Sequence, residues 1–164
     1  MPTDRVYLKT QQKGALTGTG AVNSHQEVER AHTEIIRSGH FGAENAATAT
    51  GESPLAAIYH NRKIEQIRIT VNATITTDNS NYALITFRRR DASGANGATI
   101  ATWNTHGGAQ GTLTALTPAT VTTLVTNSDA ECTGGTNQIT YQIGKTGSGV
   151  ACGAMVFELS ANAI

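Results

Sequence analysis

The segment from residue 63 to residue 76, KIEQIRITVNATIT, constrains the fold more than any other part of the sequence. Apolar residues occupy every second position in its centre, and polar residues stand between them. Successive side chains of a β-strand point to opposite faces, so this pattern predicts a strand with one buried face and one wet face. The side chains expected to point into the core are Ile67, Ile69, Val71, Ala73 and Ile75.

Strand-like segments recur through the rest of the chain, separated by clusters of turn residues. They are YALITFRRR (82–90), ATIATWNT (98–105), TLTAL (112–116), TVTTLVT (120–126), NQITYQIG (137–144) and VACGAMVFELS (150–160). No helical pattern stands between them, and consecutive strands without crossover helices indicate an antiparallel sandwich or barrel. We therefore predict an all-β domain of about eight strands over residues 61–164.

Residues 1–60 are predicted to form an N-terminal arm, because they are mostly polar and glycine-spaced. A short helix is expected at 24–38, where Ser24 and Glu27 form a capping box. Val28, Ala31 and Ile35 would share one face of this helix. The apolar stripe is narrow, so the helix would need a partner surface to persist.

Charge is distributed unevenly along a chain whose 12 basic and 12 acidic residues cancel. Between Asp91 and Lys145 only Asp129 and Glu131 are charged, and the chain contains 26 threonines. A neutral surface of this kind suits contact with other subunits or with sugars. The zero net charge provides no general attraction for nucleic acid or an anionic membrane. No apolar run approaches the roughly 20 residues needed to span a bilayer, and the N-terminus lacks the apolar region of a secretory signal, so synthesis in a cytoplasm is expected.

The stretch IGKTGSGV (143–150) ends like a phosphate-binding loop, but Ile139 stands where that motif needs its first glycine. The alternation before it and the turn residues after it predict the tip of a hairpin instead. The histidines are His25, His32, His40, His60 and His106, and none has the spacing of a metal-ligand set. No G-x-S-x-G motif occurs, and Asp129 and Glu131 are explained by a solvated loop. We expect no catalytic residue, metal or cofactor.

The cluster FRRRD (87–91) places Arg88 and Arg90 on one face of a predicted strand and Arg89 on the other. It is interpreted as the charged guard of an edge strand, as a salt-bridging patch toward an acidic partner subunit, or as a nucleic-acid contact, which would normally include exposed aromatic residues. Trp103 is expected in the core, since large aromatic residues are scarce. Whether Cys132 and Cys152 are bonded or free is left open.

The segment NQITYQIGKTGSGVACGAMVFEL (137–159) resembles the C-terminal hairpin of small jelly-roll capsid decoration (cement) proteins of tailed bacteriophages. These proteins often show a strand of the type I-T-x-x-I, a Lys-Thr-Gly-Ser-Gly-Val turn and a closing strand. The segment ALITFRRRDASGANGATIATWNT (83–105) is similar to their middle strands. The resemblance covers roughly residues 62–162 and implies a jelly-roll sandwich without catalytic residues.

In that family, trimers sit on the shell where major capsid proteins meet, and an N-terminal segment often makes the contacts. The resemblance therefore implies a homotrimer on the capsid surface of a virion, with the major capsid protein as partner and no nucleic acid or membrane bound. Candidate capsid or subunit contacts are Arg5, Lys9, Lys13, Arg30, Arg37, Arg88 and Arg90. The alternative function is a jelly-roll carbohydrate- or receptor-binding module of a virion tail or spike.

Overall fold

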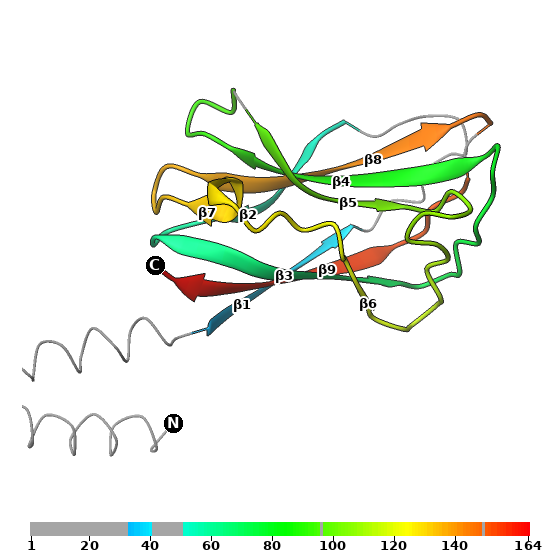
Figure 1. Cartoon of the computed structure of the whole chain (residues 1–164), viewed down its shortest axis with the longest axis horizontal. Coiled ribbons are helices and arrows are strands. Elements are labelled where there is room, and N and C mark those ends of the chain that lie inside the picture. Colours follow the sequence, from blue (N-terminus) through cyan, green and yellow to red (C-terminus); the bar gives the residue numbers. More distant parts are fainter. Residues whose placement is uncertain (1–32, 41–50, 96, 149) are drawn as a thin grey trace, which may run out of the picture.

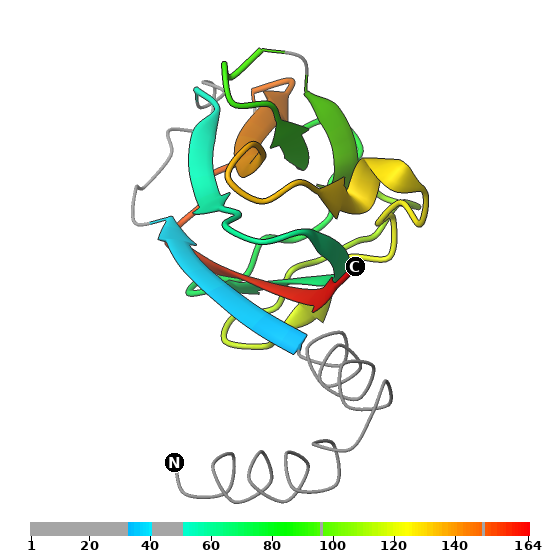
Figure 2. The same ribbon diagram turned by 90° about the vertical axis from the view of Figure 1, so that its left-hand side faces the viewer.

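The structure, a computed structural model, describes residues 33–40, 51–95, 97–148 and 150–164, which form two facing antiparallel sheets (Figures 1 and 2). The first sheet has the order β1 (Thr33–His40), β9 (Met155–Ala163), β3 (Arg62–Val71) and β6 (Ala119–Thr120), and β7 (Glu131–Cys132) also pairs with β3. The second sheet has the order β2 (Ser53–Ala57), β8 (Gln138–Thr146), β4 (Tyr82–Arg90) and β5 (Ala98–Asn104). A short 3-10 turn, η1 (Ser128–Ala130), leads into β7.

The strand pairing is that of a jelly roll. The early strands pair with the late strands in reverse order: β1 with β9, β2 with β8, β3 with β6, and β4 with β5. A long hairpin of this kind, rolled so that its strand pairs alternate between two sheets, is the jelly-roll arrangement. Strands β6 and β7 lie one after the other along the same edge of β3. The predicted antiparallel jelly-roll-like sandwich is therefore confirmed.

Apolar side chains from the inner faces of both sheets form one core. Phe157 of β9 contacts Phe87 of β4 edge-on, with ring centroids 5.3 Å apart, and Tyr141 of β8 at 4.7 Å. These contacts join the two sheets through aromatic packing. Trp103 is also buried, as predicted, and its indole N–H donates to the Gly111 carbonyl oxygen at 3.1 Å.

The alternation that predicted β3 is correct for Ile67, Ile69, Val71 and Ile75, which are all buried. Ala73 is exposed, contrary to the prediction, because β3 ends at Val71 and the chain bends at residues 72 and 73. Ile75 regains a buried position through an isolated bridge to Leu113.

Two predictions for the N-terminal part of the chain are wrong. Residues 33–38 belong to β1 and not to the second half of a helix at 24–38; residues 24–32 lie outside the described residues. The backbone groups along the edge of β9 require partners, and eight residue pairs with β1 provide them. Because β1 and β2 both precede residue 60, the sandwich begins before the predicted boundary at residue 61.

The GKTGSG stretch also differs from the predicted hairpin tip. Strand β8 lies in one sheet and β9 in the other, so residues 147–154 cross between the sheets. Gly147 has φ of 66°, and a Cβ added there would lie 2.2 Å from the Ser80 carbonyl oxygen. Glycine is therefore required by the close approach of two turns, not by a phosphate.

Candidate functional site

Four of the seven predicted contact residues, Arg5, Lys9, Lys13 and Arg30, lie outside the described residues. The other three, Arg37, Arg88 and Arg90, all lie on strands, and each binds a carboxylate of the same chain. The arginines predicted to face a partner are thus engaged within the sandwich. They still mark where its charged surface lies.

Glu52, immediately before β2, is the centre of an arginine–glutamate cluster that consists of Glu52, Arg88, Arg90, Thr140 and Gln142. Arg88 donates to Glu52 at 3.0 Å and to Gln142 at 3.0 Å, and Arg90 donates from Nε to Glu52 at 2.7 Å and also from its terminal nitrogen. The Thr140 hydroxyl donates to the same carboxylate. The strand register explains the cluster, because Thr140 lies opposite both Pro54 of β2 and Arg88 of β4.

These contacts lower the pKa of the Glu52 carboxyl group. The hydrogen bonds from Arg90 are the largest cause, and Thr140 and the positive charges of both arginines add to it, whereas burial acts in the opposite direction. The net effect lowers the pKa of Glu52 to about 2. Glu52 is therefore ionised at neutral pH, and the cluster ties the start of β2 to β4 and β8.

Arg89 points to the opposite face from Arg88 and Arg90, as predicted. It donates to the Ser128 carbonyl oxygen at 2.8 Å and lies 3.7 Å from Asp129. These contacts join β4 of one sheet to the η1 turn that precedes β7 of the other. The interpretation of FRRRD as the guard of an edge strand is wrong, because β5 and not β4 is the edge of this sheet.

A second ion-pair row crosses the outer face of the other sheet. Glu158 of β9 lies between Arg37 of β1, at 2.7 Å, and Arg68 of β3, at 3.5 Å. The pKa of Glu158 is lowered, chiefly by the hydrogen bond from Arg37. The outer faces of both sheets therefore carry paired charges.

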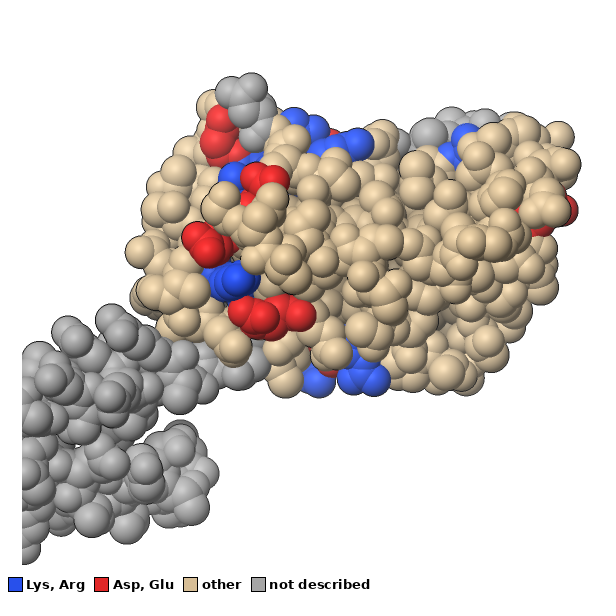
Figure 3. Space-filling model, viewed as in Figure 1, with Lys and Arg blue, Asp and Glu red and all other residues tan. Residues whose placement is uncertain are grey.

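A broad uncharged surface distinguishes the side of the molecule formed by β5 and the chain that follows it. No charged residue occurs from residue 92 to residue 128. Figure 3 shows this side: charged side chains gather toward one end, and most of the face carries none. We call residues 98–127 the neutral flank. The edge strand β5 is bound to the chain that follows it through Thr123, whose hydroxyl accepts the Thr102 N–H at 2.8 Å.

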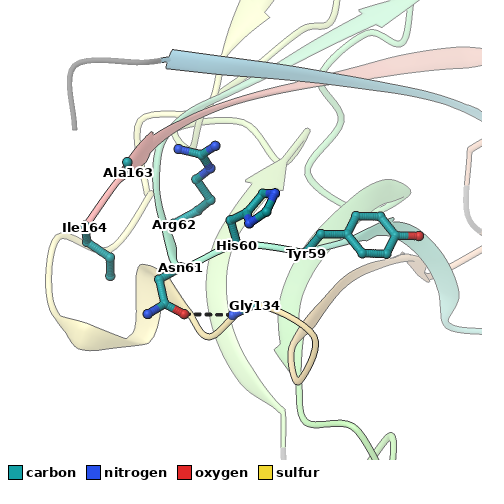
Figure 4. Close-up of a pocket in the computed structure, with 7 residues that line it drawn as sticks. All are labelled: Tyr59, His60, Asn61, Arg62, Gly134, Ala163 and Ile164. Atoms are coloured by element: carbon teal, nitrogen blue, oxygen red, sulfur yellow. Dashed lines mark hydrogen bonds between the residues drawn. The ribbon is translucent and has the colours of Figure 1, made fainter. Parts of the chain in front are cut away.

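A hollow of about 540 Å³ lies at one end of the sandwich (Figure 4). It is lined by Tyr59, His60, Asn61, Arg62, Gly134, Ala163 and Ile164. Asn61 accepts the Gly134 N–H at 3.0 Å, which fixes two of its walls. In Figure 4 Tyr59 and Ile164 stand at opposite sides of the hollow, and the Tyr59 ring points away from the other lining residues. Tyr59 is 78% exposed.

Within the described residues, no group of three or more histidine, cysteine or acidic residues is placed to hold a metal ion. His106 packs edge-on against Tyr82 with ring centroids 4.9 Å apart, and His60 lines the hollow. Cys132 and Cys152 are both free and buried. Burial raises the pKa of the Cys132 thiol to about 11. No helix in the described part of the chain is long and apolar enough to cross a bilayer.

No protein-family model matches the chain, and no curated protein matches it. Among solved structures, the chain is similar to one from the structure of the infectious bursal disease virus Gt strain, at 13% identity and a TM-score of 0.33. The match covers 80% of this chain and 32% of the other, so this chain spans about a third of that chain's length. A similarity this weak carries no argument about fold or function.

Three features of the surface were not predicted from the sequence. Glu52 stands alone in a glycine-containing segment, and its partners lie 36 to 88 residues away. Tyr59 precedes β3 without any local pattern that marks it as exposed. Leu116 is an exposed leucine in the neutral flank, and both its exposure and its positive φ are visible only in the structure. The neutral flank itself was predictable from charge distribution.

Proposed function

We propose that this protein is a structural component of a virion, which binds the outside of a tailed-phage capsid as a homotrimer and stabilises the shell without catalysis. The observation that carries the proposal is the neutral flank. Burying charged groups in an interface costs desolvation free energy, and the buried centres of protein interfaces are depleted of charged residues. A surface of threonine, alanine and glycine dissolves in water yet can be buried against protein at low cost.

The fold is compatible with this role but does not establish it, because one fold supports many functions. Further support comes from the resemblance of residues 62–162 to capsid decoration proteins. In the proposed arrangement the partner is the major capsid protein, and the location is the outer surface of the virion.

The segment before β1 is proposed to lie on the capsid side. It carries Arg5, Lys9, Lys13 and Arg30, four of the seven candidate contact residues. Fixing a chain segment in one conformation costs about 1–2 kcal/mol per residue in backbone entropy. Only a large contact surface, such as a shell, would compensate for this cost.

Deletion of residues 1–32 tests the proposal, since it leaves every described strand intact, whereas deletion of residues 1–40 would also remove β1. We expect the truncated protein to keep its circular dichroism spectrum and thermal midpoint but to lose co-sedimentation with undecorated capsids. Full-length protein is the control in both assays. Undiminished co-sedimentation of the truncated protein would show that the segment is not the anchor.

The hollow beside Tyr59 favours a second candidate function, carbohydrate or receptor binding. An exposed tyrosine at the edge of a hollow that histidine, asparagine and arginine also line offers a stacking surface and hydrogen-bonding groups of the kind that bind a sugar. Screening the full chain on a glycan array tests this candidate, with Tyr59→Ala as the matched variant. A saccharide bound by the parent protein and lost in the variant would support it; no bound saccharide would remove it.

A further inference from the structure

Leu116 has a backbone conformation that leucine rarely adopts. Its φ is 56°, and among the described residues it is the only one other than glycine with a positive φ. The left-handed region brings Cβ close to the following carbonyl group, so a leucine there is strained where glycine or asparagine is not. Its side chain is also 78% exposed, so packing in the core does not offset this strain.

Hydrogen bonds hold Leu116 in this conformation. Its N–H donates to the Val71 carbonyl oxygen at 2.8 Å, and the preceding Ala115 N–H donates to the Thr74 hydroxyl at 3.0 Å. On the other side, the Thr117 N–H donates to the Thr114 carbonyl oxygen at 3.2 Å. The turn is thus attached to the end of β3, and the leucine side chain is held outward by the fold.

Within the described residues, the Leu116 side chain therefore has no evident structural role. A large apolar side chain that is exposed and kept in a strained conformation points to a contact outside the monomer. Its surroundings agree with this, because Leu116 lies in the neutral flank, where no charge would have to be desolvated.

We propose that Leu116 is the apolar anchor of the contact between copies of this chain, and that it packs against Leu124 and Val125 of a neighbouring copy. The inference rests on the homotrimer of the proposed function. Leu124 and Val125 belong to the same flank and are only partly buried against the core, so one surface offers both the protruding side chain and an apolar position to receive it. Repeated head-to-tail, with Leu116 of each copy on the Leu124–Val125 position of the next, this contact closes a ring of three copies. The same residues paired across a two-fold axis would give a dimer instead.

The charge distribution favours a second copy as the occupant. When two neutral flanks meet, no like charges are brought together. The outer faces of the two sheets differ, since they carry the Arg37–Glu158–Arg68 row and the arginine–glutamate cluster. Contacts between copies through those faces would have to desolvate these ion pairs or rearrange them.

The test is to replace Leu116 with glycine in the full chain and measure self-association by sedimentation velocity across a range of protein concentrations. We expect Leu116→Gly to weaken association of copies at least tenfold, while the fold persists. At dilutions where both proteins are monomeric, the variant should melt at the same temperature as the parent or higher, because the strain is removed. A merely structural role would predict a lower melting temperature.

Two further variants keep the test decisive. Leu116→Met retains an apolar side chain and should associate within a few-fold of the parent. Val156→Thr changes an exposed apolar residue on the outer face of β9 and should leave association unchanged.

Three results would overturn the inference. One is a Leu116→Gly protein that associates like the parent. Another is a parent protein that is monomeric at every concentration; co-sedimentation of this parent with capsids would then decide separately whether the proposed function stands. The third is a variant that still forms trimers but no longer binds capsids, which would assign Leu116 to the shell contact and leave the proposed function intact.

Discussion

Replacing Glu52 with glutamine tests whether the arginine–glutamate cluster holds β2 in the sandwich. The substitution keeps the shape of the side chain but removes the charge that Arg88 and Arg90 both contact. It also leaves two partly buried guanidinium groups without their carboxylate. We expect the variant to fold with the same strands and a lower free energy of unfolding.

The magnitude follows from the pKa of Glu52. Its fall from 4.5 to about 2 corresponds to roughly 3 kcal/mol if the whole shift is counted. Water still reaches 21% of the side chain, so solvent screening reduces the contribution. A loss of about 1–2 kcal/mol at neutral pH is therefore expected.

The loss should depend on pH in one direction. The pKa of Glu52 is lower in the folded protein than in the unfolded chain, so its stabilising contribution is complete above pH 4.5 and disappears as the pH falls toward 2. The difference between parent and Glu52→Gln should therefore be largest near pH 7 and should shrink below pH 4.5.

Urea unfolding followed by the fluorescence of the buried Trp103 measures this difference at each pH. Both proteins are compared at one concentration, because assembly would shift the apparent stability. Glu65→Gln is the control, since Glu65 is an exposed carboxylate on β3. Equal stability of parent and Glu52→Gln at pH 7, or a loss that stays constant down to pH 2.5, would refute the reasoning.

Three other substitutions or treatments test the fold. Ile69→Lys places a charge at a position that is 0% exposed and should cost several kcal/mol in urea unfolding; an unchanged midpoint would contradict the strand assignment. Cys132 and Cys152 should both resist alkylation in the native protein and react fully in denaturant without reductant, as free buried thiols do; a mass lower by two hydrogens would reveal a disulfide instead. Gly147→Ala should lower the thermal midpoint, because its Cβ would lie 2.2 Å from the Ser80 carbonyl oxygen, whereas Gly94→Ala, where no atom is close, should lower it less.

Local patterns in the sequence were sufficient for the long strands and for one tight turn. They were wrong for the segments 112–116 and 120–126, which form only isolated bridges at Leu113 and Ala115 and the end of the two-residue β6. The period of two identified β3 and the side on which Arg88, Arg89 and Arg90 each lie. The turn residues of DASGANG correctly indicated the connection between β4 and β5, which are neighbours in one sheet. These features depend on residues close together in the chain.

Features that depend on distant residues were missed. The capping box and apolar spacing at 24–38 favour a helix locally, but the unpaired edge of β9, more than 110 residues later, determines the conformation of β1. Two consecutive strands with a glycine turn between them suggested a hairpin at 143–150. Each strand instead pairs with an earlier strand, because rolling the chain buries both inner faces.

The candidate site also has features that the sequence predicted and features that it did not. The neutral flank was visible as a long run without charge, since it needs no knowledge of contacts. The cluster around Glu52 was not, because the register of β2, β4 and β8 brings its members together. No sequence pattern marks a leucine with positive φ, so the conformation of Leu116 was found only in the structure.

Co-sedimentation with capsids tests the central claim most directly. The full-length protein is mixed with empty shells assembled from the major capsid protein encoded in the same genome, and the bound fraction is measured as its concentration rises. The account predicts saturable binding, with a stoichiometry that is a multiple of three per site. A folded protein that stays in the supernatant at every concentration would contradict it.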